Sequence, residues 1–238
     1  MIGRFLELSV HAPDVLASLA FYDSLGFTQA RTGEAWRHPY AVVTDGRLAI
    51  GLHQHEIPSP SLSFVLPELL AGIEQLERLG IEFESRRLGT DVFNLAEFIA
   101  PGGLTVRLLE ARTFSPVSRP PGQTSRLGWF EEIALPAEDL PAAVGFWERL
   151  GFVAAEQAGD PPVRIGLTSD TLNIALLAAP GLQGLALAFH DPAMAGRIAA
   201  LKEAGFAFAP RLPLPLDPAH NRLLLAPEGT PLLLLTGE

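Results

Sequence analysis

The chain repeats itself, and this repeat limits the possible folds more than any other feature. Residues 14–27 read DVLASLAFYDSLGF and residues 139–152 read DLPAAVGFWERLGF, at an offset of 125 residues. The offset continues without gaps towards the start of each half, where it relates Glu7 to Glu132. An internal repeat of this length predicts two halves with the same fold.

Each half is itself double, which gives four units in two pairs. Helix endings of the type LGF, LGI or AGF recur four times, at Phe27, Ile81, Phe152 and Phe206. The spacings are 54, 71 and 54 residues, so the middle gap is the wide one. Residues 113–125 (TFSPVSRPPGQTS) lie in this gap and are rich in Pro, Ser and Gly, as linkers are. The predicted domains are therefore 1–112 and 126–238.

Every unit follows the same order of elements. A short apolar strand comes first, a helix of about three turns follows, and further strands separated by turns complete the unit. Asp14 and Asp139 precede the first and third helices, where a carboxylate caps free N–H groups. Four glycines close the helices, where a left-handed residue is required: Gly26, Gly80, Gly151 and Gly205. The pattern predicts an α+β fold made of four βαβββ modules.

Charge and cysteine content exclude several classes of function. Asp and Glu number 27 against 17 Lys and Arg, a net charge of −10, which argues against nucleic acid or an anionic membrane as partner. The chain has no cysteine, which excludes disulfides, cysteine zinc sites and a thiol nucleophile. No apolar segment has the length of a signal peptide or membrane span, so we expect a cytoplasmic protein. Lys202 is the only lysine, which together with heavy Leu, Ala and Pro usage indicates a GC-rich bacterial genome.

The first helix carries a recognisable pattern, D-x-x-x-S-L-x-F-Y-x-x-L-G-F. It consists of Asp14, Ser18, Leu19, Phe21, Tyr22, Leu25, Gly26 and Phe27. This pattern resembles the vicinal oxygen chelate superfamily, which groups glyoxalase I, bleomycin-resistance proteins and extradiol dioxygenases. The resemblance covers nearly the whole chain and implies a tandem form. In it, each pair of modules forms an open, eight-stranded, barrel-like sheet around a cavity.

The resemblance also implies where a metal would sit. Enzymes of the superfamily hold a divalent metal with ligands from the first and last strands of each module. In the first half these positions fall on Glu7, Gly51, Ser61 and Arg107, and in the second on Glu132, Ala175, Ala186 and Leu233. Only the two glutamates are strong metal ligands. We therefore expect no metal and no other cofactor, although a divalent metal is an alternative.

Two predictions follow for the glutamates. In the first cavity, we expect Arg107 to form an ion pair with Glu7 in place of a metal, with Ser61 hydrogen-bonded to one of them. In the second, we expect Glu132 to face apolar residues, where desolvation raises a carboxyl pKa unless a cation such as Arg164 reaches it. Glu7 and Glu132 are the candidate acid/base residues, and the alternative for both is a structural carboxylate.

Histidines and aromatic residues near the first cavity are candidate ligand-binding residues. His53 and His55 follow Gly51, and both face the cavity if the strand continues. Trp36, His38 and Tyr40 alternate, so on a strand they share one face, which suits a flat ligand. The alternatives are a fraying strand end for the histidines and a core stripe for the aromatic residues.

Three functions are compatible with these features. The first is a metal-independent protein that binds a small molecule, similar to bleomycin-resistance proteins. The second is a metal-dependent lyase, isomerase or dioxygenase that uses a set such as Glu7, His53 and His55. The third is an interaction module whose cavities are filled by side chains. The expected partner is a small-molecule ligand, and the chain is a monomer or a homodimer.

Overall fold

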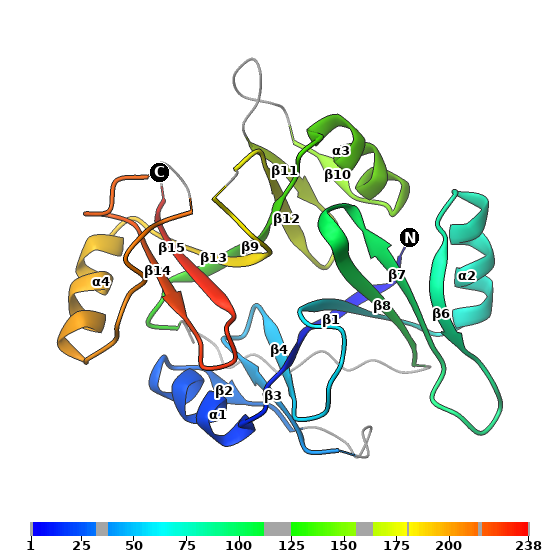
Figure 1. Ribbon diagram of the computed structural model, residues 1–238, viewed down its shortest axis with the longest axis horizontal. Coiled ribbons are helices and arrows are strands. Elements are labelled where there is room, and N and C mark those ends of the chain that lie inside the picture. The colour runs from blue at the N-terminus through cyan, green and yellow to red at the C-terminus, as the bar shows by residue number, and fades with distance from the viewer. Residues whose placement is uncertain are drawn as a thin grey trace.

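The computed structural model describes residues 2–31, 38–111, 125–155, 164–179, 181–213 and 216–237, and two open sheets dominate it (Figure 1). The first sheet has eight strands. In spatial order they are β2 (Thr28–Gln29), β3 (Tyr40–Thr44), β4 (Ala49–His53), β1 (Arg4–His11), β5 (Ser61–Leu66), β8 (Leu104–Glu110), β7 (Leu95–Ala100) and β6 (Phe83–Arg87). Within each module the first and last strands pair in parallel, as β1–β4 and β5–β8, and the antiparallel pair β1–β5 joins the two modules.

The second sheet repeats this arrangement with seven strands. In spatial order they are β10 (Val153–Ala154), β11 (Arg164–Thr168), β12 (Asn173–Leu177), β9 (Trp129–Pro136), β13 (Ala186–Asp191), β15 (Pro231–Thr236) and β14 (Arg222–Leu225). The parallel pairs are β9–β12 and β13–β15, and the antiparallel pair β9–β13 joins the modules. The pairing of the two sheets confirms the internal repeat.

One strand of the predicted pattern is missing from the described part of the fourth module. The counterpart of β6 is the segment after Phe206, where Phe208 makes a single isolated bridge to Leu224. Pro210 and Pro213 lie in this segment, and proline has no N–H to donate to a sheet. The expectation of eight strands in the second sheet is therefore wrong by one strand.

Four helices follow the leading strands: α1 (Val15–Ser24), α2 (Leu69–Arg78), α3 (Leu140–Arg149) and α4 (Met194–Glu203). The predicted caps are confirmed, because Asp14 accepts the N–H of Ala17 at 2.9 Å and Asp139 accepts that of Ala142 at 3.0 Å. The four predicted glycines have positive φ angles between 81° and 98° just after the helices. A side chain at such an angle is strained, which explains why the sequence signal is so regular.

Each sheet packs its helices on one face, and we call the opposite face the inner face. On β1, Leu8 and Val10 join the core cluster together with Tyr22 of α1. Because strand side chains alternate, Glu7 and Ser9 point the other way. The first inner face contains Glu7, Ser9, Tyr40, Gly51, His53, Ser61, Ser63, Glu97 and Arg107. The second contains Glu132, Ala134, Arg164, Ala175, Leu177, Ala186, Ala188 and Leu233.

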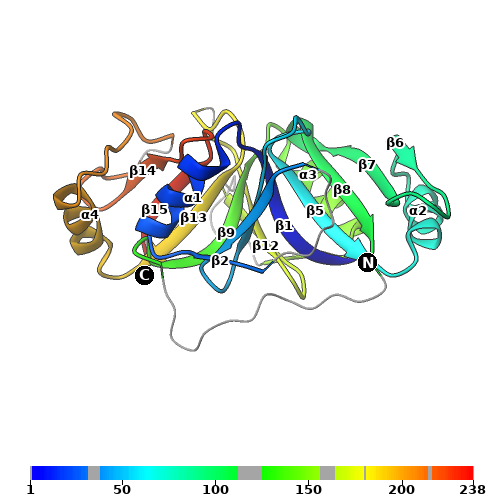
Figure 2. The same ribbon diagram turned by 90° about the horizontal axis from the view of Figure 1, so that it is seen from below.

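The two halves share one hydrophobic core. Figure 2 shows the two sheets side by side, with α4 and α2 at opposite ends of the molecule. Phe27 stacks edge-on against Phe189 with ring centroids 6.3 Å apart, so the first module contacts the fourth. Phe98 and Phe146 lie at the same distance and join the second module to the third. One core cluster includes residues of both halves, so the contact between them is apolar.

A buried polar cluster adds to the contact between the first and fourth modules. Glu228, in the turn before β15, accepts hydrogen bonds from the hydroxyls of Ser18, Tyr22 and Thr230, each at 2.7 Å. Burial, and then the nearby Glu228 carboxylate, raise the pKa of Tyr22 well above its usual value. The turn is therefore tied to α1 through charge-assisted hydrogen bonds.

The predicted linker falls almost entirely on residues 112–124, outside the described part, so the domain boundaries remain a prediction. The sheets occupy residues 4–110 and 129–236. Across the described residues, no helix is long and apolar enough to cross a membrane.

Candidate functional site

Glu7 is the central residue of the first inner face. It sits on β1 with only 2% of its surface exposed. Its carboxylate lies over Gly51 on β4, where an added Cβ atom would come within 2.1 Å of Glu7 Oε1. Any side chain at position 51 would displace the carboxylate, so the glycine makes room for the glutamate.

Three side chains hold the Glu7 carboxylate. Ser9 donates to Oε1 at 2.7 Å, and Tyr40 donates through a short hydrogen bond to Oε2. His53 Nε2 lies 3.2 Å from Oε1. Ser9 is itself hydrogen-bonded to Ser63 at 2.8 Å. The buried carboxylate is thus held in place by hydrogen-bond donors, on a face that also carries the Arg107–Glu97 ion pair.

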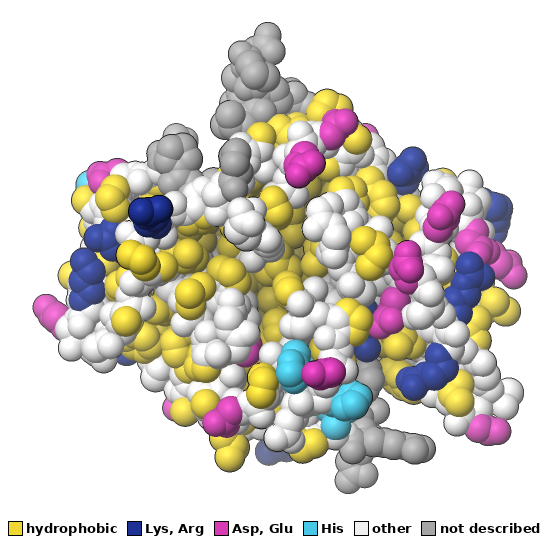
Figure 3. All heavy atoms as spheres, viewed as in Figure 1, with side chains coloured by type: hydrophobic (Ala, Val, Ile, Leu, Met, Phe, Trp, Pro, Cys, Tyr) yellow, Lys and Arg dark blue, Asp and Glu magenta, His cyan; other side chains and the backbone are white. Residues whose placement is uncertain are grey.

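A second histidine extends this cluster towards the surface. His38 Nε2 lies 3.0 Å from His53 Nδ1. His53 is fully buried, whereas His38 is partly exposed. Burial is the largest cause that lowers the pKa of His38, followed by the charges of His53, His55 and Arg107. His38 is therefore neutral at pH 7. Figure 3 shows histidine side chains gathered at the lower part of the molecule.

The other residues predicted to line the first cavity, His55, Tyr40 and Trp36, do not all lie beside His53. The strand β4 ends at His53, so the condition under which His55 would share its face is not met, and His55 lies beyond the strand end. His55 is exposed and contacts the site only through its ring, 5.4 Å from that of His38. Tyr40 begins β3 and donates to Glu7, whereas His38 precedes the strand, so the expected alternation of His38 and Tyr40 along one strand is not formed. Trp36 lies outside the described residues.

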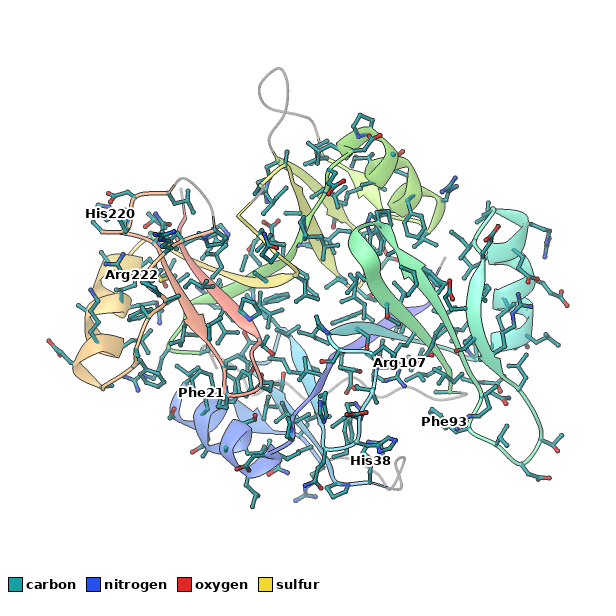
Figure 4. All side chains as sticks on the ribbon, viewed as in Figure 1. Phe21, His38, Phe93, Arg107, His220 and Arg222 are labelled. Atoms are coloured by element: carbon teal, nitrogen blue, oxygen red, sulfur yellow. The ribbon has the colours of Figure 1, made fainter. Side chains whose placement is uncertain are left out.

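Arg107 lies on the first inner face but does not form the predicted ion pair with Glu7. Its Nε donates to Glu97 Oε1 at 3.0 Å. Glu97 is directly opposite Arg107 on the neighbouring strand β7, whereas Glu7 is two strands away, across Ser63. Neighbouring strands are about 4.8 Å apart, so the nearer carboxylate takes the guanidinium. Figure 4 shows Arg107 and His38 in the same half of the molecule.

Ser61 is on the first inner face as predicted, but its expected hydrogen bond is not formed. Its side chain is fully buried, and its Oγ has no hydrogen-bond partner within the described residues. Its strand neighbours on this face are Ser9 and Thr105. A buried hydroxyl without a partner is costly, so Ser61 stays a candidate ligand-binding residue.

The second inner face is mainly apolar, in contrast to the polar first face. Ala134, Leu177, Ala186 and Leu233 form a separate apolar cluster together with Leu182. Leu212, in the proline-rich segment after α4, packs against this cluster. Loop side chains therefore cover this face, as the third hypothesis expected for filled cavities.

Glu132 lies at the edge of this apolar cluster. Arg164 Nη2 donates to its Oε2 at 2.5 Å, and the Arg164 side chain is 51% exposed. The carboxylate therefore has the cation that the sequence analysis named as its possible partner. His190 has its pKa lowered by burial, against the opposing charge of Glu132. His220 contacts Asp217 on the exposed loop, away from Glu132. Figure 4 labels His220 beside the end of β14.

Sequence reasoning missed four residues of the first site. No sequence motif includes Ser9, Ser63 or Glu97, and His38 was predicted only to line a pocket. Ser9 and Ser63 carried one usable signal, since each is a polar residue between apolar ones on a central strand. The pairing of Glu97 with Arg107 depends on the register between two strands, which the sequence does not give.

A cavity of a different kind lies elsewhere in the molecule. It has a volume of about 520 Å³ and lies between the halves, lined among others by Arg4, Leu66, Leu150 and Asp170. No residue of the inner-face site lines it, so the chemistry of Glu7 and the shape of this cavity are separate features.

Comparison with known proteins gives the fold. No family model matches the sequence, and no curated protein matches it. Among solved structures, a catechol 2,3-dioxygenase is 15% identical, with a TM-score of 0.62 over 99% of this chain and 88% of that one. The Mn(II)-bound glyoxalase from Novosphingobium aromaticivorans is 18% identical, with a TM-score of 0.65 over 98% and 81%. A variant of homoprotocatechuate 2,3-dioxygenase from B. fuscum in complex with HPCA is 15% identical, with a TM-score of 0.62 over 99% and 71%.

These comparisons contradict the expectation that no cofactor is involved, because a structure with this fold is Mn(II)-bound. The question is therefore whether the described side chains supply the ligands that a divalent metal requires. Within the described ranges, no three His, Cys, Asp or Glu side chains form a group that could hold one. His38 approaches His53 from the side opposite Glu7, and His55 is exposed. The described donors thus do not fit the ligand set of a divalent metal.

The similarity to these solved structures covers the arrangement of all four modules. Coverage of 98–99% includes both halves, and the four modules recur in the pairing of both sheets. The chain therefore has the vicinal oxygen chelate fold in its tandem form, the fold of extradiol dioxygenases and glyoxalases.

Proposed function

We propose that the first inner face binds a small oxygenated molecule and that Glu7 is its acid/base residue. One observation carries the proposal. A buried carboxylate held by three side-chain donors lies on the same face as the Ser61 hydroxyl, which has no hydrogen-bond partner within the described ranges. Buried polar groups that the fold does not satisfy are typical of binding and catalytic sites.

The chemistry that suits this arrangement is proton transfer at a carbon next to a carbonyl group. Glu7 removes the proton, and the electron pair of the C–H bond moves to the carbonyl oxygen, which becomes an enolate. Ser61 donates its hydroxyl hydrogen to that oxygen, and the charge of Arg107 on the same face stabilises it. Return of the proton to a neighbouring atom completes an isomerisation, and loss of a leaving group completes a lyase reaction.

The neighbours suggest which molecules to try first. They include two dioxygenases named for catechols, one of them in complex with HPCA, and a glyoxalase. Homoprotocatechuate and small 2-hydroxy ketones are therefore suitable probes, because both carry oxygen atoms on adjacent carbons. A cytoplasmic location, a monomeric or homodimeric state, the absence of nucleic-acid binding and the 1–112 and 126–238 domain boundaries stay predictions of the sequence.

The test uses one variant in each half. Thermal denaturation is measured with and without each probe for the wild type, Glu7→Gln and Glu132→Gln. A molecule that binds the folded state raises Tm by mass action. We expect the wild type and Glu132→Gln to respond equally and Glu7→Gln to respond weakly or not at all.

Proton abstraction has its own readout. Deuterium from D2O should enter a 2-hydroxy ketone at the carbon next to its carbonyl in the presence of wild type, and Glu7→Gln should abolish this incorporation. A response that survives in Glu7→Gln but is lost in Glu132→Gln would move the site to the second half and refute the proposal.

A further inference from the structure

We propose that His38 and His53 form a two-step proton path between Glu7 and the surface of the protein. The inference rests on the proposed acid/base role of Glu7, because a buried acid/base residue must exchange its proton between turnovers. Glu7 is 2% exposed and His53 is fully buried, whereas His38 is partly exposed. The contacts are 3.2 Å from Glu7 Oε1 to His53 Nε2 and 3.0 Å from His53 Nδ1 to His38 Nε2.

The direction of these hydrogen bonds follows from chemistry. An ionised carboxylate only accepts hydrogen bonds, so the proton of neutral His53 is on Nε2. His53 Nδ1 is then an acceptor and takes the N–H of His38 Nε2. Ser9 and Tyr40 also donate to the carboxylate, so all the side-chain hydrogen bonds at Glu7 run towards it.

A proton can move along this chain with every bond accounted for. His38 first takes a proton from water or buffer on Nδ1. Its Nε2–H bond then breaks as an N–H bond forms at His53 Nδ1. Finally the His53 Nε2–H bond breaks as an O–H bond forms at Glu7 Oε1. Both imidazoles end neutral with the proton on Nδ1, and the net change is one proton delivered to the carboxylate.

The charges around His38 favour passing the proton on. Burial lowers the pKa of His38 most, and the charges of His53, His55 and Arg107 lower it further. An imidazolium at His38 is therefore short-lived and does not trap the proton. Glu97 holds the Arg107 guanidinium from the neighbouring strand, so this positive charge is fixed in place.

Two neighbouring residues serve as comparisons. His55 has its ring 5.4 Å from that of His38, yet none of its described hydrogen bonds reaches Glu7 or His53. Tyr40 donates directly to Glu7 and offers a second route to it. Variants of these residues separate the proposed path from general effects on the histidine cluster and from transfer through the tyrosine.

The experiment follows exchange of the His53 Nε2 proton with water by NMR, on protein labelled with 15N-histidine and without any ligand. The proteins are wild type, His38→Gln, His55→Gln and Tyr40→Phe. Glutamine at 38 can still donate to His53 Nδ1 but cannot pass a proton on. We expect exchange in His38→Gln to slow by about tenfold or more, with His55→Gln and Tyr40→Phe close to wild type.

A second measurement separates a path from a merely structural role. Since the path begins with protonation of His38, exchange in the wild type should accelerate as the pH falls, and this acceleration should be lost in His38→Gln. Free imidazole should restore exchange in His38→Gly. Equal exchange rates in wild type and His38→Gln would overturn the proposal, as would slowing in Tyr40→Phe alone. Failure of every probe to bind would instead refute the proposed function and leave the exchange result standing.

Discussion

The two inner faces are built on equivalent strands but differ in almost every side chain. At the four positions that converge in this fold, the first half has Glu7, Gly51, Ser61 and Arg107, and the second has Glu132, Ala175, Ala186 and Leu233. The first face keeps buried polar groups in a hydrogen-bonded cluster, whereas leucines of two loops cover the second.

This difference indicates that one half stabilises the fold while the other carries polar groups suited to binding. A face filled with apolar side chains stabilises the molecule, because burial of apolar area is the main driving force for folding. A face that buries Glu7 and a hydroxyl without a partner costs stability and needs a function to explain it. Under the proposed function, the second half is a scaffold for the site of the first, and the two halves share one core cluster.

The largest expected effect is a loss of stability when the apolar packing of the second inner face is disrupted. Leu233 is fully buried in the apolar cluster. Leu233→Ala should lower the free energy of unfolding by about 3–4 kcal/mol, because it leaves a cavity among packed side chains. Urea denaturation measures this. Probe binding at the first face should be unchanged in the same variant, and a loss below about 1 kcal/mol would show that the second face is not packed.

The next test exchanges one residue type between the faces. Ala186 and Ser61 occupy equivalent positions, and both are fully buried. Ala186→Ser should lower the free energy of unfolding by about 1–2 kcal/mol, since it buries a hydroxyl among apolar groups. Ser61→Ala should raise it by about 1 kcal/mol while weakening probe binding. Equal signs for the two variants in denaturation experiments would contradict the division of tasks.

A smaller effect is expected for the glutamate of the second half. Glu132→Gln should lower the free energy of unfolding by less than about 1 kcal/mol, because Arg164 is half-exposed and water weakens the pair. The same measurement on Glu7→Gln gives the comparison. If Glu132→Gln were the more damaging variant for probe binding, the functional site would belong to the second half.

The smallest expected effect is a shared dependence on pH. Burial lowers the pKa of His38 in the first half and of His190 in the second below the ordinary value of 6.5. The unfolded chain therefore binds protons that the folded chain does not, and the stability contributed by neutral histidine is lost as the pH falls below 6.5. Denaturation at pH 7.5 and 5.5 should show a smaller difference in His190→Gln than in wild type. An unchanged difference would mean that His190 titrates as freely in the folded protein as in the unfolded one.

The sequence by itself determined the architecture. The 125-residue offset, the capping aspartates and the glycines after the helices predicted four βαβββ modules, and the structure confirms them except for one strand in the described part of the fourth. These signals are local, because a cap or a positive φ angle depends on a few neighbouring residues. The resemblance to the superfamily also implied that Glu7, Ser61 and Arg107 share one face, and the strand pairing places them there.

The partners of those residues were decided only by the tertiary structure. Glu97 takes Arg107 because the register of β7 and β8 places them opposite each other, and that register is set by the packing of whole strands. The contact of His38 with His53 depends on where β3 begins and β4 ends. Leu182 and Leu212, which cover the second inner face, come from two loops that are distant in sequence. No local sequence pattern predicts that these leucines pack there. Local chemistry thus fixes the elements and their faces, whereas long-range packing fixes which side chains meet and hence which half holds the site.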